Sequence, residues 1–546
     1  MASLIPETTK KLFTAENLRS ATKQSDRCLI VPVRLRRAIK KYLREQGEPH
    51  MKKKVLRLSE SFSDIKDKNL MLAINTSKEL VEDPFKSMER SKRWKIKSSY
   101  GDIGLNYRDD ETIAYVASRM PAVFSACYRV LSEVRRRLPG FSPAKILDFG
   151  AGTGSAFWAI REVWPKSLQK VNLVEPSQSM QRAGRSLIQD LKNLPLIHSY
   201  NSLQDLSKSI RKSERKHDLV IASYVLGEIP SLKDRITIVR QLWELTGDVL
   251  VLIEPGTPHG FGIISQMRSH ILWMEKRVSS LFLIEHSLAQ ELFISMNFQK
   301  CGKAEGKINE TCKDLVPYKG GAFVIAPCSH DGSCPLVKSG KYCHFVQRLQ
   351  RTTSQRAYKR SKGETLRGFE DEKFSFVAFR RGQRPRLDYD LNVVYHCFTS
   401  LHLNRKPWPL DGMRFETLKE QHAKRNPEDL EIDYEDLMEQ NQPEEEVPYE
   451  EVGPVYYDSD VIETDTNDDN DEEEQEEEAQ ADLGGGWGRI VFSPFKRGRQ
   501  VTLDVCRSNN RDNSEGSFER IVVTKSKSPA LHYQARRSHW GDLWPF

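Results

Sequence analysis

The chain has 546 residues, with 84 Lys and Arg, 76 Asp and Glu and a formal net charge of +8. This length is sufficient for two or three domains. The sequence contains no run of 18 apolar residues, so we expect no membrane-spanning helix. Nine cysteines in so long a chain do not form the dense framework typical of a secreted disulfide-rich protein.

The charge is unevenly distributed along the chain. Between Glu428 and Asp482 there are 26 acidic residues and no Lys or Arg, which leaves 84 bases against 50 acids elsewhere. This basic excess favours a polyanionic partner, RNA, over a surface that only aids solubility. The acidic run is poor in apolar residues and its charges repel each other, so we expect 426–486 to be a disordered insertion. It is either a solvated spacer or a mask for the basic surface.

The first 100 residues are basic, with 24 Lys and Arg against 12 Asp and Glu. We expect 1–100 to form a helical extension that binds RNA. The first 45 residues include only four acids, which fits a mitochondrial transit peptide in part, whereas the early Glu7 does not fit one. Composition alone leaves import into an organelle open.

The most informative segment is 145–154, with the sequence KILDFGAGTG. An apolar strand reaches an acid, Asp148, and the three glycines Gly150, Gly152 and Gly154 then form a tight turn before a helix. Glycine accepts positive φ angles and lets a ligand approach the backbone, and a helix N-terminus favours electron-rich atoms. The pattern lacks the Lys-Ser/Thr of a P-loop and the G-x-G-x-x-G spacing of dinucleotide sites. It resembles motif I of the S-adenosylmethionine (SAM) methyltransferases.

Further strands are predicted at 171–176, 217–224 and 248–256, with helical stretches between them. This alternation predicts an α/β fold with a Rossmann-like class I SAM-methyltransferase sheet over 101–326. The segment 372–382 also reads as a strand, which pairs with 322–326 and completes the sheet. We therefore expect 327–425 to contain a cysteine loop and this completing strand, followed by the acidic insertion and a basic segment at 487–546.

The predicted SAM site lies where the carboxyl ends of these strands gather. Glu175 ends the second strand, 21 residues after the glycine turn, where an acid bonds ribose hydroxyls in nucleotide-binding sheets. A Rossmann-like domain with an empty pocket is the alternative. The predicted cofactor-binding residues are Asp148, Gly150, Gly152, Gly154, Glu175, Ser223 and Tyr224.

Cys328, Cys334 and Cys343 lie within 16 residues, in a C-x5-C-x8-C pattern rich in Gly and Pro. The paired C-x2-C of zinc ribbons is absent, and four thiolates around iron and sulfide fit such a loop better. His330 and His344 keep a zinc site open, and three unconnected thiols are the simplest alternative. The candidates for a fourth ligand are Cys397, Cys506, Cys301 and Cys312.

With these motifs the chain resembles the methyltransferase-like assembly factors of the mitochondrial small ribosomal subunit. The resemblance covers roughly 100–400 and 487–546. It rests on the turn at 148–154, YVLGEIP at 224–230, IEPGTP at 253–258, the cysteine loop at 326–345 and SHWGDL at 538–543.

The resemblance implies a SAM-binding fold that carries a [4Fe–4S] cluster and contacts small-subunit rRNA in the mitochondrial matrix. By the family pattern, the fourth ligand follows a basic strand near the C-terminus, which matches 497–506 and favours Cys506 over Cys397. The implied metal ligands are therefore Cys328, Cys334, Cys343 and Cys506, with the acidic insertion between the third and the fourth.

The sequence offers no identifiable catalytic residue. Amino-methylating enzymes place Asn or Asp and then Pro-Pro-aromatic after the strand that ends near Ser223, where this chain has SYVL at 223–226. The family's members are regarded as non-catalytic or unproven methyltransferases, which points the same way. We expect an assembly factor that is monomeric away from the ribosome, works with other assembly factors and does not bind membranes. An active rRNA methyltransferase and a zinc-stabilised RNA-binding protein without SAM are the alternatives.

Overall fold

A computed structural model describes residues 22–24, 28–46, 107–229, 231–276, 321–337, 339, 341–356, 367–384, 487–509 and 515–544. The acidic insertion, most of the N-terminal extension with the transit-peptide prediction, and Cys301, Cys312 and Cys397 lie outside these residues. None of the helices in the described ranges is both long and apolar enough to cross a membrane.

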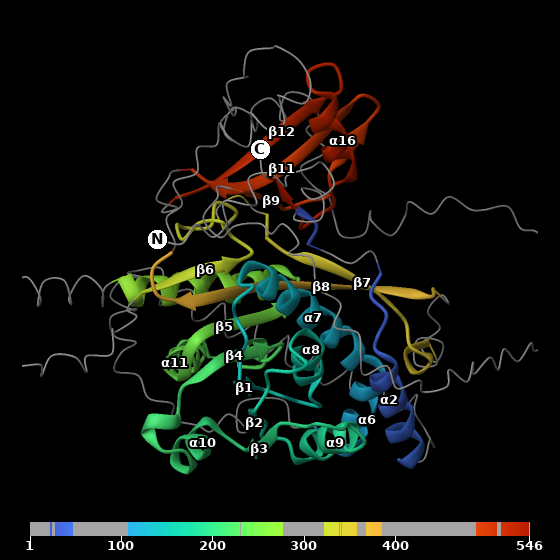
Figure 1. The fold of residues 1–546 in the computed structure, drawn as a ribbon, viewed down its shortest axis with the longest axis vertical. Helices are drawn as coiled ribbons and strands as arrows, with labels where there is room; N and C mark the ends of the chain where they lie inside the picture. Colours follow the sequence, from blue (N-terminus) through green and yellow to red (C-terminus); the bar gives the residue numbers. More distant parts are fainter. Residues whose placement is uncertain are drawn as a thin grey trace, which may run out of the picture. The chain divides into compact units, whose positions relative to one another are not determined.

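A mixed sheet of eight strands forms the larger part of the described fold (Figure 1). Its order is β3-β2-β1-β4-β5-β8-β6, with β7 also paired to β8. Strands β1 to β5 are parallel, and β8 is antiparallel to each of its neighbours, which confirms the methyltransferase-like α/β fold. The strands are β1 (Lys145–Phe149), β2 (Lys170–Val174), β3 (Leu196–Tyr200), β4 (His217–Ser223), β5 (Thr246–Pro255), β6 (Ala322–Ala326), β7 (Phe345–Gln350) and β8 (Phe369–Arg381).

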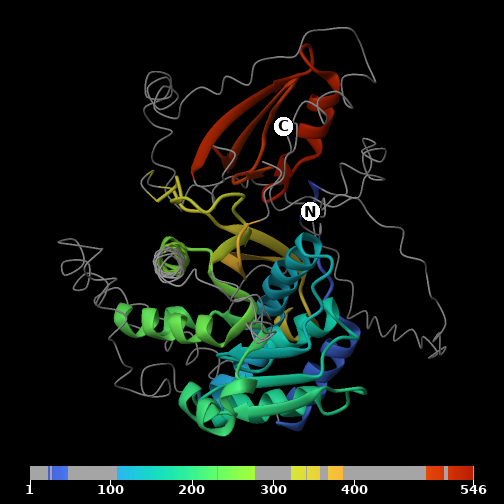
Figure 2. The ribbon, with the colours of Figure 1, turned by 60° about the vertical axis from the view of Figure 1, so that its left-hand side comes forward.

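Helices cover both faces of this sheet (Figures 1 and 2). The strands are therefore apolar on both sides, as in β1, where Ile146 packs on one face and Leu147 and Phe149 on the other. One face is covered by α2 (Val33–Glu45), α6 (Asp109–Ser118), α7 (Met120–Arg137), α8 (Ser155–Val163) and α9 (Gln178–Ile188). The other is covered by α10 (Leu203–Ser209), α11 (Leu232–Leu245) and a helix described over 258–276.

The predicted completing strand is confirmed as β8, which lies between β5 and β6 and pairs with 322–326 as expected. The cysteine loop thus connects β6 to a further strand, β7, that the sequence analysis did not anticipate. In β7 the side chains of Phe345, Gln347 and Leu349 are buried and alternate with more exposed ones. The alternation is typical of a strand, but the sequence analysis did not use it.

A second, antiparallel sheet is built from the C-terminal residues, in the order β10-β11-β9-β13 with β12 beside β11. Its core contains Val501, Leu503 and Val505 of β11 and Ala535 of α16. The basic strand that the resemblance implies within 497–506 is present, and Cys506 lies inside it. The elements are β9 (Gly488–Ile490), β10 (Phe495–Arg497), β11 (Gln500–Ser508), β12 (Gly516–Thr524), α16 (Pro529–Arg537) and β13 (Leu543–Trp544).

Candidate functional site

The glycine turn lies at the carboxyl end of β1, beside the point between β1 and β4 where the strand order reverses. Gly150, Gly152 and Gly154 have φ angles of 71°, 54° and 86°, a left-handed conformation that suits glycine. A Cβ added at Gly150 would lie 2.5 Å from Val225 Cγ2, so this glycine lets the segment after β4 pack against the turn. A Cβ at Gly152 would meet nothing nearer than 4.0 Å, so its position is open to a ligand.

Two buried acids lie beside the turn. Asp148 is fully buried, and neither of its carboxylate oxygens has a hydrogen-bond partner among the described residues. Burial, and then the charge of Glu175, raises the pKa of Asp148 to about 7. Glu175 accepts hydrogen bonds from the backbone N–H groups of Gly152 (2.9 Å) and Ser177 (2.8 Å), and burial raises its pKa to about 7. Because buried polar atoms are almost always paired, the oxygens of Asp148 mark a place for donors of a ligand or water.

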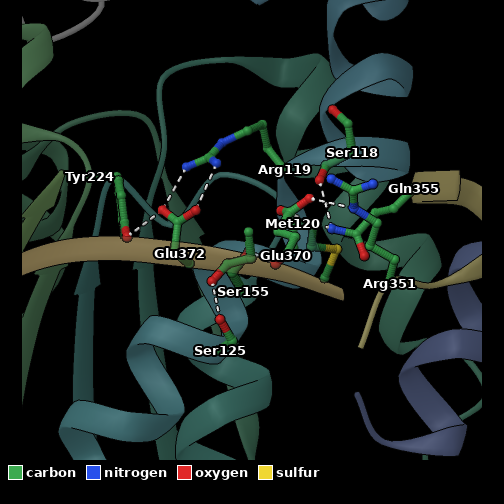
Figure 3. Close-up of polar contacts among 11 residues, drawn as sticks. Ser118, Arg119, Met120, Ser125, Ser155, Tyr224, Arg351, Gln355, Glu370 and Glu372 are labelled. Carbon is green, nitrogen blue, oxygen red and sulfur yellow. Dashed lines mark hydrogen bonds and ion pairs between the residues drawn. The ribbon is translucent and has the colours of Figure 1, made fainter. Parts of the chain in front are cut away.

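β4 ends at Ser223, and Tyr224, the next residue, is held in a network that the sequence analysis missed (Figure 3). Tyr224 has a φ of 57°, and its hydroxyl donates to Glu372 Oε1 of β8 at 2.7 Å. Arg119 donates to both oxygens of the same carboxylate, at 3.0 Å each. Burial, and then Glu372, raises the pKa of Tyr224 well above its usual value, so the phenol stays protonated and donates. The residue after β4 is thus fixed by its own chain.

Arg119 lies at the junction between α6 and α7, and a second network holds this junction against β8 (Figure 3). The side-chain amide of Gln355 donates to the backbone oxygen of Ser118 at 3.1 Å and to Glu370 at 3.3 Å. Arg351 lies 3.5 Å from the Glu370 carboxylate. No local sequence pattern indicates either network. The hydrogen bonds of Glu372 to Arg119 and Tyr224, and that of Gln355 to Ser118, join residues more than 100 positions apart in the chain.

The segment before α6 crosses between two of the strand ends. Tyr107 donates its hydroxyl to Glu228 Oε1 at 2.8 Å, and its backbone oxygen accepts from Ser177 Oγ at 2.9 Å. Ser177 follows β2, whereas Glu228 belongs to the short 3-10 helix after β4 (Leu226–Glu228). Tyr107 therefore connects the loops on either side of the glycine turn, a contact that the sequence analysis also missed.

Two of the motifs on which the resemblance rests contact each other. Glu254 of β5 accepts hydrogen bonds from the backbone N–H groups of Leu226 (2.8 Å) and Gly227 (3.2 Å). Burial raises the pKa of Glu254 to about 7. The IEPGTP segment therefore shapes the YVLGEIP loop, which packs in turn against the glycine turn.

The second candidate site is a pocket lined by all four predicted cysteine ligands, Cys328, Cys334, Cys343 and Cys506. The first three come from the loop between β6 and β7, and the fourth comes from β11. Two cationic side chains, Arg268 and Arg489, also line the pocket. The remaining lining residues are Phe261, Ile264, Ser265, Pro327, Leu336, Ser375, Phe376 and Val491.

The four thiols interact electrostatically. Burial, followed by Cys328, raises the pKa of Cys334 to about 11. Burial and the other thiols raise the pKa values of Cys343 and Cys506 well above the usual range. Among the described residues, no group of three or more Cys, His, Asp or Glu side chains is placed to hold a metal ion.

The two histidines proposed as alternative ligands differ in their surroundings. His330 is fully buried, its Nε2 lies 3.6 Å from Cys506 Sγ, and burial lowers its pKa to about 3. His344 packs against the rings of Tyr342 and Trp540, with centroids 4.5 and 4.3 Å away. The side chain of His330 thus contacts a predicted ligand, whereas that of His344 packs between aromatic rings.

Arg489 joins the second sheet to the first beside the cysteine pocket. Its side chain is buried, donates to the backbone oxygens of Pro327 (3.1 Å) and Gly541 (2.7 Å), and forms an ion pair with Glu133 of α7. Burial opposes ionisation of Glu133, but Arg489 and neighbouring arginines outweigh it and hold its pKa below the usual value. The C-terminal sheet is therefore attached to α7 and to the start of the cysteine loop.

A family model described as "Mitochondrial small ribosomal subunit Rsm22" matches residues 109–281, 302–399 and 438–545. The human protein named ribosome assembly protein METTL17, mitochondrial, is 29% identical over 288 residues, which are 52% of this chain and 52% of that protein. Ribosome assembly protein RSM22, mitochondrial, of Saccharomyces cerevisiae is 23% identical over 491 residues, or 80% of this chain and 67% of that protein.

Rsm22-cox11 tandem protein 2, mitochondrial, of Schizosaccharomyces pombe is 24% identical over 450 residues, or 80% of this chain and 43% of that protein. The chain thus spans about half the length of its human and S. pombe relatives. Among solved structures, magnesium protoporphyrin IX methyltransferase of Synechocystis with bound SAM is 15% identical, with a TM-score of 0.22. That likeness covers 36% of this chain and 83% of the other.

Proposed function

Because the chain belongs to the mitochondrial small ribosomal subunit Rsm22 family, we propose that it is an assembly factor of that subunit. It binds SAM and a [4Fe–4S] cluster, contacts small-subunit rRNA and works without methyl transfer. The family match supports the role in subunit assembly, and the names of the human and yeast relatives agree with that role. The proposal places the protein in the mitochondrial matrix, as a monomer away from the ribosome and alongside other assembly factors.

The residues at the strand ends fit SAM as a ligand. The position of Gly152 is open, the oxygens of Asp148 are buried without partners, and Glu175 lies across the turn with lone pairs left for ribose hydroxyls. Bound SAM would bring a sulfonium-linked methyl group to this edge. Asp148 and Glu175 would accept hydrogen bonds from the ligand, and Tyr107 would keep the loops on either side together.

The chemistry of the cysteine pocket supports an iron–sulfur cluster as its ligand, although among the described residues its side chains are not grouped to hold a metal ion. Four thiols are the usual ligand set of [4Fe–4S], which takes up more room than a single ion, and here the thiols surround a cavity. The raised pKa values of Cys334, Cys343 and Cys506 mean that bare thiolates at these positions are unstable without added positive charge. Bound iron would supply that charge, and Arg268 and Arg489 would offset the rest of the negative charge on the thiolates. A bound cluster would supply four metal–thiolate bonds between the loop and β11.

The surroundings of Tyr224 support the absence of methyl transfer. In amino-methylating enzymes, the residues after β4 receive the acceptor, but here Tyr224 donates to Glu372, which Arg119 holds through both oxygens. A nucleobase acting as methyl acceptor would have to displace a partly buried ion pair and a phenol hydrogen bond. Neither Tyr224 nor Ser223 offers a base for proton removal, since burial keeps the tyrosine protonated.

Three measurements on the full chain test this proposal. After anaerobic purification, iron and sulfide in a ratio near one are expected, whereas stoichiometric zinc without sulfide would support the zinc-stabilised alternative. Calorimetric titration should detect SAM binding. Mass mapping of small-subunit rRNA with and without the protein should show unchanged methylation. Assembly of the subunit should be impaired when the protein is absent. The loss of one methyl group in the absence of the protein would instead assign an active rRNA methyltransferase.

A further inference from the structure

The C-terminal sheet has one face whose two ends differ in exposure. The strand registers place Phe495 opposite Thr502 and Thr502 opposite Val522, so these three side chains lie in a row on one face. Cys506 is on the same face, because alternate residues of β11 point to the same side. At its end of the strand Cys506 is buried in the cysteine pocket, whereas Phe495 is 64% and Val522 is 50% exposed.

Cationic side chains gather around the exposed end of this face. Arg497 shares the face, Arg499 lies in the turn between β10 and β11, and Lys525 follows β12. All three are exposed. The two loops are joined, because the backbone N–H of Lys525 donates to Arg499 O at 2.8 Å and Arg536 of α16 donates to Gly498 O at 2.9 Å.

These cations have no acidic partners nearby in sequence. Neither 495–503 nor 520–541 contains an Asp or Glu. The acids in the middle of the sheet are already paired, Asp504 with Arg520 at 2.7 Å and Glu519 with Arg507 at 3.6 Å. Burial lowers the pKa of Lys496, and the charge of Arg536 lowers it further, as expected for cations crowded together. Among the described residues, cations therefore outnumber acids at this end of the sheet, where Asp542 is the acid whose charge acts on Lys496.

We propose that this surface, which we call the exposed sheet end, binds a single-stranded segment of RNA. Arginine and lysine side chains neutralise phosphates, and an exposed aromatic ring on an open sheet provides a platform on which an unpaired base stacks. A duplex hides the faces of its bases, so it cannot use Phe495 in this way. The inference rests on the proposed function for RNA as the partner. It adds which surface of the protein binds the RNA and that the bound RNA is single-stranded. The exposed sheet end consists of Phe495, Arg497, Arg499, Val522, Lys525 and Arg536.

The test measures binding of a fluorescein-labelled single-stranded RNA of about 16 nucleotides and mixed sequence to the full chain by anisotropy. Phe495→Ala should weaken binding by about 5- to 150-fold, the usual range for loss of a base–aromatic stack. Its matched control is Leu196→Ala, which truncates a 58% exposed apolar side chain on β3. An unlabelled RNA duplex of equal length should compete less well than the single strand.

The charge contribution is tested with Arg497→Ala, Arg499→Ala and Lys525→Ala combined. The slope of log affinity against log salt should fall by about 3, because each lost phosphate contact removes about one unit. The control combines Lys166→Ala, Lys208→Ala and Lys212→Ala, which are exposed lysines of the larger domain, and should leave the slope unchanged. Thermal unfolding midpoints and iron content should match the wild type in all of these surface variants.

Each contrary outcome has a separate meaning. If Phe495→Ala and the triple variant bind the RNA as well as the wild-type chain does, RNA binding is retained but its assignment to the exposed sheet end is refuted. If the duplex competes as well as the single strand, the stacking role is wrong. If poly-glutamate of equal charge displaces the RNA at the same concentration, the surface accepts acidic polymers in general and the RNA assignment fails. If the wild-type chain does not bind RNA, the RNA contact of the proposed function fails with it.

Discussion

Asn at position 148 should make the protein more stable and a poorer binder of SAM. The pKa of Asp148 rises from an ordinary value of 3.8 to about 7 in the folded chain, with burial as the main cause. The folded state therefore binds more protons than the unfolded state between about pH 4 and about pH 7, so the free energy of unfolding falls as pH rises through that window. At about 1.36 kcal/mol per pKa unit, the ionised carboxylate destabilises the fold by about 4 kcal/mol at pH 8.

Asp148→Asn removes this charge while nearly keeping the shape of the side chain. We expect the variant to exceed the wild type by up to about 4 kcal/mol at pH 8 and to converge with it near pH 4, as measured by urea unfolding across that range. SAM affinity at pH 8 should fall by about tenfold or more, because hydrogen bonds to a charged acceptor are lost. Asp190→Asn, at an exposed acid, is the control and should show neither effect. A variant that is less stable than the wild type at pH 8 would refute the reasoning from burial.

Three further predictions concern the turn, the acidic insertion and the metal. Gly152→Val should abolish SAM binding by calorimetry while the protein stays folded, and Gly498→Val, at an equally left-handed and open position remote from the turn, should keep it. Deleting 428–482 should leave RNA affinity equal or higher in a filter-binding assay, and weaker binding would show that the acidic run contributes contacts. Cys506→Ser should lose iron on anaerobic purification, whereas Cys28→Ser should keep it. If Cys506→Ser kept its iron and Cys397→Ser lost it, the fourth ligand would be Cys397.

Local chemistry was readable from the sequence because it depends on neighbours along the chain. The glycines at 150–154 predicted a turn with positive φ angles, and the alternation of apolar runs with helical stretches predicted the parallel sheet. The cysteine spacing indicated a common site, and the structure brings Cys328 and Cys506 to one pocket although 178 positions separate them. That grouping came from the family resemblance, since spacing alone left Cys397 equally open.

Contacts between distant polar residues could not be predicted. Arg119 and Glu372 come from a helix junction and a late strand, and each taken alone reads as an ordinary surface or core side chain. Tyr224 was predicted to bind the cofactor, and nothing in the sequence indicated its hydrogen bond to Glu372. Arg489 likewise read as one more basic residue of a basic segment, whereas it is buried and paired with Glu133. Pairing of this kind depends on the finished packing of the sheet and helices, which no periodicity in the sequence encodes.

An ion pair attaches the C-terminal sheet beside the cysteine pocket, and the proposed cluster would add metal–thiolate bonds that should contribute more. The pair of Arg489 and Glu133 is buried on both sides, so its attraction is largely offset by the loss of hydration of both charges. Replacing both, as in Arg489→Met with Glu133→Gln, should therefore cost less stability than the two single variants added together, and Arg489→Met alone should cost about 3–5 kcal/mol because the buried carboxylate of Glu133 loses its main partner.

A bound cluster has no such offset, because metal–thiolate bonds to a site that is absent from the unfolded chain contribute directly to folding. They would also close the long connection between Cys343 and Cys506, which loop entropy alone opposes. Cys506→Ser should consequently release β11 and β12 to rapid amide exchange, whereas the Arg489→Met and Glu133→Gln double variant should keep them protected. If the double variant exposed the two strands while Cys506→Ser left them protected, the ion pair and not the cluster would be what places the sheet.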